Sequence, residues 1–428
     1  MCRVTGRPPT RHRARTVAAL LLVALAGCSG AGGRSPAVPP SAPSGALSAS
    51  AAGRSASDVA SVLQDLLARR DAAVLTGDTA AFRATLADAG SREGRAQLGQ
   101  LATARALRVQ RLAHDVVAPV DDPSAVDVTV RYRLGGLDRA DRTATVRYAV
   151  AEVDGRWRVR SATPADGRAA PPWVVLPGAT VRRTAHAVVV GVGAAGELAA
   201  ASATVDRALP GLRRTWDGTP AQVLVLLPGT AAQAAALLGH AGTTVGEVAG
   251  TTDGPVGADG RATGDRVVLD PVAHRRLTPS GRDVVLTHEL THVAVRATLA
   301  GTTPTWLAEG YADHLGYARA DVAVSALLAP LTAAVRAGTA PTAVPTAADL
   351  DPAQGDIEVG YLAAWQAVEL VAERDGEGAV VRLVRACTVP GDEDAAERAC
   401  DAAMPAVLGT DRAGFTRAWR QRLAALAR

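Results

Sequence analysis

Lysine is absent from the 428-residue sequence, so arginine alone supplies its 46 basic side chains. Together with the high alanine and glycine content, this absence is typical of a GC-rich coding sequence and does not indicate special binding chemistry. Five of the arginines lie in the first 27 residues, where no acidic residue occurs, and without that segment the net charge falls from +4 to −1. A nearly neutral chain has no electrostatic basis for binding nucleic acid.

The apolar run from Thr16 to Ala26 is too short for a stable transmembrane helix, which needs about 20 residues. It lies between a basic start and small residues, which is the pattern of a secretory signal peptide. The Leu25-Ala26-Gly27-Cys28 sequence that follows resembles the lipobox of bacterial lipoproteins, in which the cysteine is diacylated and becomes the mature N-terminus. The resemblance implies a signal peptide at 1–27 and a lipid anchor at Cys28 on the extracytoplasmic face of the cell membrane. The alternative is an ordinary signal peptide that happens to end at a cysteine.

Cysteine is scarce, with four in the whole chain. Cys2 would leave with the signal peptide and Cys28 would carry the lipid, so only Cys387 and Cys400 remain. An even pair in an exported chain is most simply a disulfide, which for a loop of this length contributes about 3 kcal/mol in the chain-entropy model. Two buried free thiols are the alternative.

Large apolar side chains are almost missing between residues 28 and 55, where Gly, Ser, Ala and Pro predominate. Such a segment cannot bury enough surface to offset the entropy lost on ordering. It is therefore predicted to be a disordered tether that holds the folded part of the chain away from the membrane. The remaining length and the 48% hydrophobic content allow two or three domains with packed cores.

Residues 56–165 are predicted to form a small α+β domain. Apolar residues recur at helical spacing after Ser57 and again near 96–107, and alternating patterns that favour strands follow at 126–132, 143–150 and 155–159. Helices followed by antiparallel strands resemble the nuclear-transport-factor-2-like or cystatin-like class, in which a curved sheet wraps around a helix. His114 and Asp115 belong to no catalytic pattern, and we expect them in a solvated loop.

A domain boundary is expected between Pro164 and Pro172, and residues 172–428 form the second predicted domain. Apolar runs at 187–190, 223–227 and 266–271 favour buried strands, with helical patterns at 197–216 and 230–238 between the first and last of them. The Gly- and Thr-rich segment 242–264 favours a long loop. Nearly everything after Ser280 is helical in pattern, so we expect a mixed sheet that leads into a helical half.

The helical part contains Thr287-His288-Glu289-Leu290-Thr291-His292-Val293. Residues four apart share one face of an α-helix, so His288 and His292 can bind one metal ion from adjacent turns. Glu289 is offset by about 100°, from where it can reach a metal-bound water as a general base. The apolar residues around this motif predict a largely buried helix, whose first turn we expect to be capped by Ser280 and Asp283.

A catalytic zinc ion usually has three protein ligands and one open position. Glu309 lies 17 positions after His292, within Trp306-Leu307-Ala308-Glu309-Gly310-Tyr311-Ala312-Asp313. The HELTH and WLAEGYAD sequences together resemble the gluzincin zinc metallopeptidases, and most closely their peptidase MA-like branch. The resemblance implies a thermolysin-like zincin fold, one zinc ion bound by His288, His292 and Glu309, Glu289 as the base, and Asp313 as the acceptor of a hydrogen bond from a ligating histidine.

Tyr361 opens a helical stretch at a place where such families often carry a tyrosine that faces the metal and donates a hydrogen bond to the reaction's oxyanion. The alternative is a packing residue. The segment Arg266–Leu269 could be the sheet edge along which a substrate peptide pairs, or an ordinary internal strand. We expect the other histidines of this domain to be structural or exposed, namely His186, His240, His274 and His314.

The Gly-x-Met-Glu-Asn loop of aminopeptidases is missing, so exopeptidase action is not supported, and Ala308-Glu309 does not match the Asn-Glu pair of thermolysin. The sequence therefore predicts a membrane-tethered, extracytoplasmic zinc endopeptidase acting on peptides or proteins. The alternative is a zinc-stabilised cell-envelope module without catalysis, in which the first domain binds a partner and the peptidase fold is a scaffold.

Overall fold

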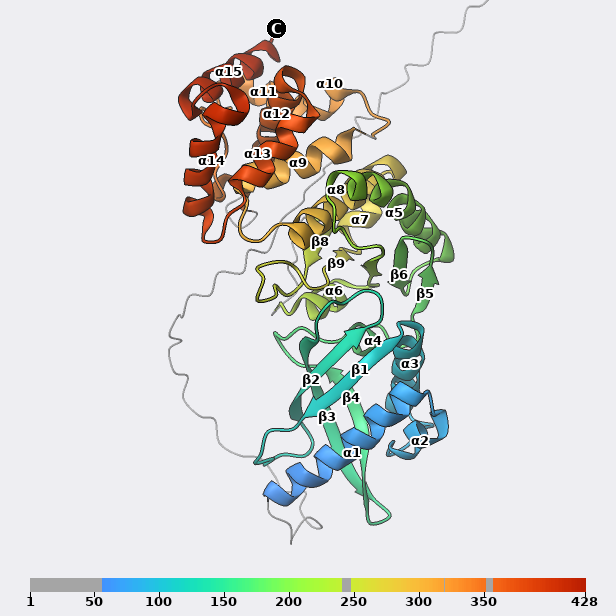
Figure 1. Cartoon of the computed structure of the whole chain (residues 1–428). Helices are drawn as coiled ribbons and strands as arrows, with labels where there is room; N and C mark the ends of the chain where they lie inside the picture. The colour runs from blue at the N-terminus through green and yellow to red at the C-terminus, as the bar shows by residue number, and fades with distance from the viewer. Residues whose placement is uncertain (1–55, 241–247, 319, 352–356) are drawn as a thin grey trace, which may run out of the picture.

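The computed structural model describes residues 56–240, 248–318, 320–351 and 357–428, and it has an α+β fold with one antiparallel and one mixed sheet (Figure 1). The predicted signal peptide, Cys28 and the tether lie outside the described residues, so these remain predictions. None of the helices in the described ranges is long and apolar enough to cross a membrane.

The N-terminal part combines three helices with a four-stranded antiparallel sheet in the order β1-β2-β3-β4. Alternate residues of β2 are buried, as the period-2 pattern predicts. The helix α1 packs against β1 and α3 packs against β4. The elements are α1 (Ala56–Thr76), α2 (Thr79–Ala84), α3 (Arg92–Ala106), β1 (Val109–Asp115), β2 (Val126–Leu134), β3 (Arg142–Val153) and β4 (Arg156–Pro164).

The expectation that His114 lies in a solvated loop is wrong. His114 is in β1 and is buried, with its Nδ1 2.6 Å from Asp71 Oδ1 and its Nε2 2.7 Å from the Tyr148 hydroxyl. The strand β1 has no strong apolar alternation of its own, and it forms because it pairs with β2. The histidine is buried because two distant side chains satisfy both of its ring nitrogens.

The central sheet has the order β5-β6-β7-β9-β8, in which β6, β7 and β9 are parallel and the two outer strands are antiparallel. The outer strand near the helical half is β8, so the prediction of a loop over 242–264 is wrong for these residues. The strand β9 is internal, so it is not the sheet edge along which a peptide could pair. The elements of this region are α4 (Pro172–Val175), β5 (Thr180–Arg183), β6 (Ala187–Gly191), α5 (Ala195–Thr215), β7 (Val223–Leu227), α6 (Ala231–Leu238), β8 (Gly250–Asp253) and β9 (Arg266–Leu269).

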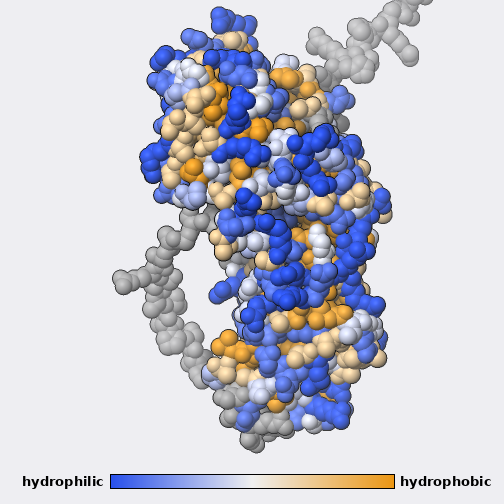
Figure 2. Space-filling view, in the orientation of Figure 1, coloured by the Kyte–Doolittle hydropathy of each residue, from blue (hydrophilic) through white to orange (hydrophobic). Residues whose placement is uncertain are grey.

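Both faces of the central sheet are buried, in two different hydrophobic cores. Along β7, Val225 faces the core that α5 and the C-terminal helices form, whereas Leu224 and Leu226 face the core of the N-terminal part. This explains the continuous apolar runs of β6 and β7, because a strand covered on both sides has no polar face. The two predicted domains therefore share an apolar contact. On the face of the molecule shown in Figure 2, hydrophilic residues dominate the surface and apolar patches lie among the hydrophilic residues.

The helical half begins after β9. The helix α8 carries the histidine motif, and its N-cap is Thr278, whose hydroxyl accepts a hydrogen bond from the Gly281 N–H, so the predicted capping by Ser280 and Asp283 is wrong. The elements are α7 (Ala273–Arg276), α8 (Pro279–Thr298), α9 (Thr305–Tyr317), α10 (Val324–Leu327), α11 (Ala329–Ala337), the 3₁₀ helix η1 (Ala348–Leu350), α12 (Glu358–Asp375), α13 (Glu377–Cys387), α14 (Glu393–Leu408) and α15 (Arg412–Ala425).

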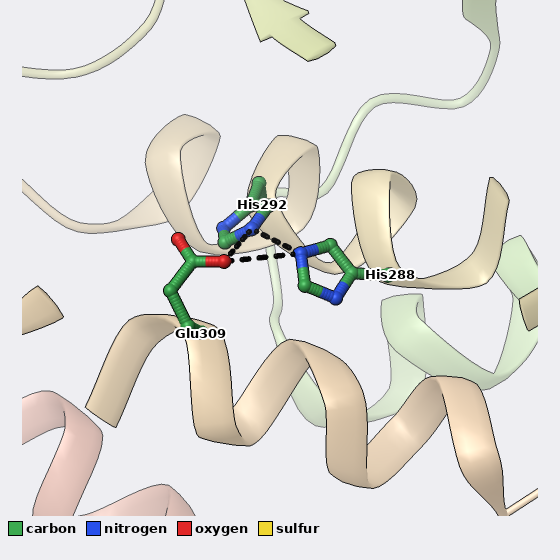
Figure 3. A group of neighbouring side chains, drawn as sticks. All are labelled: His288, His292 and Glu309. Carbon is green, nitrogen blue, oxygen red and sulfur yellow. Dashed lines mark hydrogen bonds and ion pairs between the residues drawn. The ribbon is translucent and has the colours of Figure 1, made fainter. Parts of the chain in front are cut away.

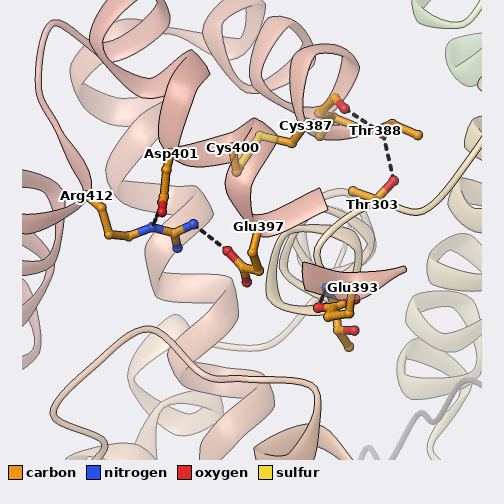
Figure 4. The surroundings of a disulfide bond; sticks show 10 residues. Thr303, Cys387, Thr388, Glu393, Glu397, Cys400, Asp401 and Arg412 are labelled. Carbon is orange, nitrogen blue, oxygen red and sulfur yellow. Dashed lines mark hydrogen bonds and ion pairs between the residues drawn. A yellow bond between two sulfur atoms is a disulfide. The ribbon is translucent and has the colours of Figure 1, made fainter. Parts of the chain in front are cut away.

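A disulfide between Cys387 and Cys400 joins α13 to α14 (Figure 4). The turn between these helices contacts the segment that precedes α9. Thr302 and Val389 exchange two backbone hydrogen bonds, and Glu393 Oε1 accepts a hydrogen bond of 2.7 Å from the Thr305 N–H at the start of α9. The disulfide thus stabilises the helix pair that holds the N-terminus of α9, the helix of Glu309.

His314 connects three helices. From α9, its Nδ1 lies 2.8 Å from Glu369 of α12, and its Nε2 lies 2.9 Å from Glu377 of α13. Burial opposes the charged form, but hydrogen bonds to the two carboxylates raise the pKa of His314 above its usual value. His314 is therefore a buried structural residue whose charge holds α12 and α13 on α9.

We expect the contribution of His314 to stability to depend on pH. Because its pKa is raised on folding, the contribution is complete below the unfolded value of about 6.5 and is lost as the pH rises through the folded value. Measured from pH 5.5 to 9 on metal-saturated protein, the melting temperature of wild type should exceed that of His314→Gln by about 1–2 °C at the acid end, the shift expected for about 1 kcal/mol at an unfolding entropy of roughly 2.1 cal/mol/K per residue in a protein of this size. A difference that is constant or grows with pH would contradict this assignment.

Candidate metal centre

The two histidines of the motif lie on the buried face of α8. This helix packs between α5, β8 and α9, and His288 is fully buried while His292 is 5% exposed. The helical spacing therefore brings both imidazoles to the same side, as the sequence predicts. Their Nε2 atoms are 2.9 Å apart.

Glu309 approaches the imidazoles from α9, which packs along α8 (Figure 3). One of its oxygens, Oε2, lies 3.2 Å from His288 Nε2 and 3.6 Å from His292 Nε2. Across the described ranges, these three residues are the only group of three His, Cys, Asp or Glu side chains close enough together to hold a metal ion.

The triangle of donor atoms has the size that a metal ion requires. At bond lengths of about 2.0–2.1 Å, two ligands of a tetrahedral zinc ion lie about 3.3 Å apart, and the three separations here are 2.9, 3.2 and 3.6 Å. Neither oxygen of Glu309 accepts a hydrogen bond of good geometry, although both are buried. Buried carboxylate oxygens without donors cost free energy, which a cation bound among them would offset. The residues present therefore fit a metal ion.

Asp313 lies one turn after Glu309 on α9 and contacts the first histidine from behind. Its Oδ1 is 2.8 Å from His288 Nδ1, and the aspartate is 2% exposed. A carboxylate at this nitrogen holds the proton on Nδ1 and leaves the lone pair of Nε2 directed at the donor triangle. The sequence resemblance implied such a contact with one of the histidines, and the structure identifies His288.

The charges of the site oppose the effect of burial. Burial disfavours the charged form of His288, but the hydrogen bond to Asp313 and the nearby carboxylate of Glu309 raise its pKa to about 10. Burial also disfavours the charged form of Glu309, and the two imidazoles reverse this and lower its pKa to about 2. Without a metal, the buried carboxylate of Glu309 is thus paired with the protonated imidazole of His288. A divalent cation bound at the site would displace one proton of that imidazolium.

Glu289 is 1% exposed, and the outer strand β8 determines its position. The Thr252 hydroxyl donates a hydrogen bond of 2.7 Å to Glu289 Oε2, while Oε1 has no partner. A Cβ atom at Gly250 would lie only 3.0 Å from Glu289 Cγ, so any larger residue there would crowd the Glu289 side chain. Burial raises the pKa of Glu289, and its imidazole neighbours and Thr252 oppose that shift.

The sequence pattern does not indicate the contact of Thr252 with Glu289, because the Gly- and Thr-rich segment 242–264 around it favours a loop. The two consecutive threonines, 251 and 252, are good strand formers and were the available signal. Hydrogen bonds from two directions hold the connection between β8 and β9. Arg296 of α8 donates to Asp265 and to the Gly254 carbonyl, and Arg142 of the N-terminal part donates to the Gly264 carbonyl. The position of β8 therefore depends on both halves of the molecule.

Tyr361 lies on α12, which packs against α9, and its side chain is 5% exposed. Burial raises its pKa, and the nearby carboxylates of Glu309, Asp313 and Glu289 raise it further. The structure thus brings Tyr361 to the carboxylates of the site, while it also belongs to the hydrophobic core. Its role as an oxyanion donor stays a prediction.

A scan against protein-family models finds no match to this chain, and a search of curated proteins finds none either. Any functional conclusion therefore rests on the chemistry of the site, because an α+β fold alone is compatible with many activities.

We predict that the purified protein contains about one equivalent of a divalent metal per chain and that His292→Ala abolishes this stoichiometric binding, because two ligands rarely retain an ion. Elemental analysis after dialysis measures both. His274→Ala, at a histidine outside the donor triangle, is the matched control and should retain the metal. Equal metal content in all three proteins would exclude the site.

Asp313→Asn should weaken metal binding about 10- to 100-fold, because an amide no longer stabilises the ligating form of His288. Competition with a chromogenic chelator gives the dissociation constants. The neighbouring carboxylate Asp321, exposed on the loop after α9, offers Asp321→Asn as a control without effect. An unchanged dissociation constant for Asp313→Asn would show that this carboxylate does not support the ligand.

Proposed function

We propose that this chain is a zinc-dependent metallopeptidase that hydrolyses peptide bonds on the extracytoplasmic face of the membrane. The observation that carries the proposal is the buried triangle of His288 Nε2, His292 Nε2 and Glu309 Oε2, with Glu289 one residue away from the first ligand. The resemblance of HELTH and WLAEGYAD to the gluzincins supports the same assignment.

The donor set favours zinc. Two imidazole nitrogens and one carboxylate oxygen suit a borderline ion that accepts four ligands, whereas magnesium and calcium prefer sites made of oxygen. Three protein ligands leave one coordination position for substrate or water. When bound there, zinc supplies Lewis acidity towards the scissile carbonyl and lowers the pKa of a coordinated water.

Glu289 is the proposed proton carrier. Its Oε2 is fixed by the Thr252 hydroxyl, and the unpartnered Oε1 is free to accept a proton from water and later to donate it to the leaving amine. Burial raises the pKa of this carboxyl, which makes proton transfer in both directions easier near neutral pH. The Tyr361 hydroxyl is the proposed donor to the oxyanion, because it lies near the same carboxylates and stays protonated.

The location is proposed from the sequence alone. The basic and apolar N-terminus with the lipobox-like Leu25–Cys28 supports export and lipid attachment, and the Gly-, Ser- and Pro-rich segment that follows supports a tether. The disulfide between Cys387 and Cys400 is in keeping with an oxidising compartment outside the cytoplasm.

The burial of the site favours one rival, a zinc-stabilised module without catalysis. His288, Glu289 and Glu309 are each at most 1% exposed, as expected for a structural ion enclosed by its ligands. The unpartnered Oε1 of Glu289 favours the peptidase, since a purely structural site has no use for a buried carboxylate that is not a ligand.

Glu289→Gln separates the two functions. This substitution should lower kcat/KM on an internally quenched peptide library by about 10²- to 10⁴-fold, because the glutamine cannot accept a proton. The metal content should stay at the wild-type level. Elemental analysis of the same samples confirms that the site is still occupied.

Two results would count against the peptidase. Hydrolysis unchanged by Glu289→Gln would rule out the proposed proton carrier. Stoichiometric zinc in a wild-type protein that hydrolyses no member of the library would favour the non-catalytic module.

A further inference from the structure

The N-terminal part contains a cavity of about 760 Å³ between α1, α2 and the start of β4. These elements lie at the end of the molecule opposite the helical half (Figure 1). A volume of this size is within the range of about 300–1,000 Å³ that is usual for a pocket that binds a small molecule. The cavity is separate from the metal centre, because no residue described at that centre lines it.

The wall of this cavity is largely apolar. The helix α1 contributes Val62 and Leu66, small alanine side chains follow from α1 and α2, and β4 contributes the ring of Trp157. Contact between such a wall and an apolar ligand is favourable by about 25 cal/mol for each Å² of apolar surface removed from water. The body of a fitting ligand is therefore apolar.

The charges that line the cavity are mostly positive. Arg69 of α1 and Arg156 of β4 line it from two different elements, and within the described chain neither guanidinium has a hydrogen bond or an ion pair. Arg158 also lines it, with Nη1 donating to the Ala84 carbonyl. The one acidic residue of the lining, Asp78, already accepts a hydrogen bond as the N-cap of α2. Two unpaired cations without an available acid favour an anion.

Two buried donors of the same lining are unsatisfied. Arg158 Nε and Trp157 Nε1 are shielded from solvent and have no acceptor. Buried donors in folded proteins nearly always find a partner, so these two leave hydrogen-bonding capacity in the cavity wall that the described chain does not use. A carboxylate is an anion with two acceptor oxygens and forms short, strong hydrogen bonds with arginine.

We propose that this cavity binds an amphipathic carboxylate, a ligand with an apolar body and one carboxylate that Arg69 and Arg156 hold between them. Two kinds of molecule share this chemistry, an aliphatic acid and the free C-terminus of an apolar peptide. The predicted tether is not the ligand, because residues 29–55 contain two arginines and no acidic residue. The proposal does not depend on the peptidase activity.

Isothermal titration calorimetry on the whole protein tests the proposal with matched probes. Sodium decanoate should bind saturably at one site per chain, whereas decyltrimethylammonium, with the same chain and the opposite charge, should not. The peptide acetyl-Ala-Leu-Leu with a free carboxylate is compared with its amide, both titrated into Glu289→Gln so that the peptide stays intact. Binding of either acid but not of its uncharged or cationic counterpart supports the proposal and identifies the kind of ligand.

Variants separate this cavity from other sites. Arg69→Gln with Arg156→Gln should weaken binding of the acid at least tenfold, about the effect of losing one charge-assisted hydrogen bond. Arg83→Gln with Arg160→Gln removes the same charge from exposed positions on α2 and β4 that do not line the cavity, and should leave the dissociation constant unchanged. A carboxylate that binds at the metal centre would survive the first double substitution, and this result, or no binding of either acid, would overturn the proposal.

Discussion

The structure depends on one contact between two helices, at which α8 and α9 bury two imidazoles and two carboxylates. His288, His292, Glu309 and Asp313 are each at most 5% exposed. A charge buried alone costs several kcal/mol, so these groups are tolerable only together, with each carboxylate facing an imidazole or a cation. The spacing of the three donor atoms also fits a metal ion. This is the reason that the site, and not the fold, indicates the function.

Much of the surrounding architecture holds this contact in place. The disulfide-linked pair α13 and α14 caps the start of α9, and α12 covers its outer side. On the other side of α8, the outer strand β8 brings Thr252 to Glu289. Under the proposed function these supports matter, since catalytic groups act only within a few tenths of an ångström of their working position.

The N-terminal part contributes to the same arrangement. It covers the second face of the central sheet, and its Arg139 and Arg142 bond the connection between β8 and β9. It is therefore more than a separate module on the same chain.

The sequence by itself determined the features that depend on local spacing. The period of the helix places His288 and His292 on one face, the 17 residues to Glu309 allow one turn and a new helix, and alternating or continuous apolar runs located β2, β3, β6 and β7. These features follow from backbone geometry, which the order of residues expresses directly. The disulfide between Cys387 and Cys400 agrees with the prediction made from the two cysteines that lie outside the first 28 residues.

Only the tertiary structure decided which distant groups meet. His114 is buried between Asp71 and Tyr148, and Asp313 contacts His288 rather than His292. The outer strand is β8 rather than β9, and it brings Thr252 to Glu289. A pattern of polar and apolar residues shows which side of an element is buried but not what covers it. That choice depends on the packing of segments tens of residues apart, where the free energy of a buried polar group depends on the partner that it finds.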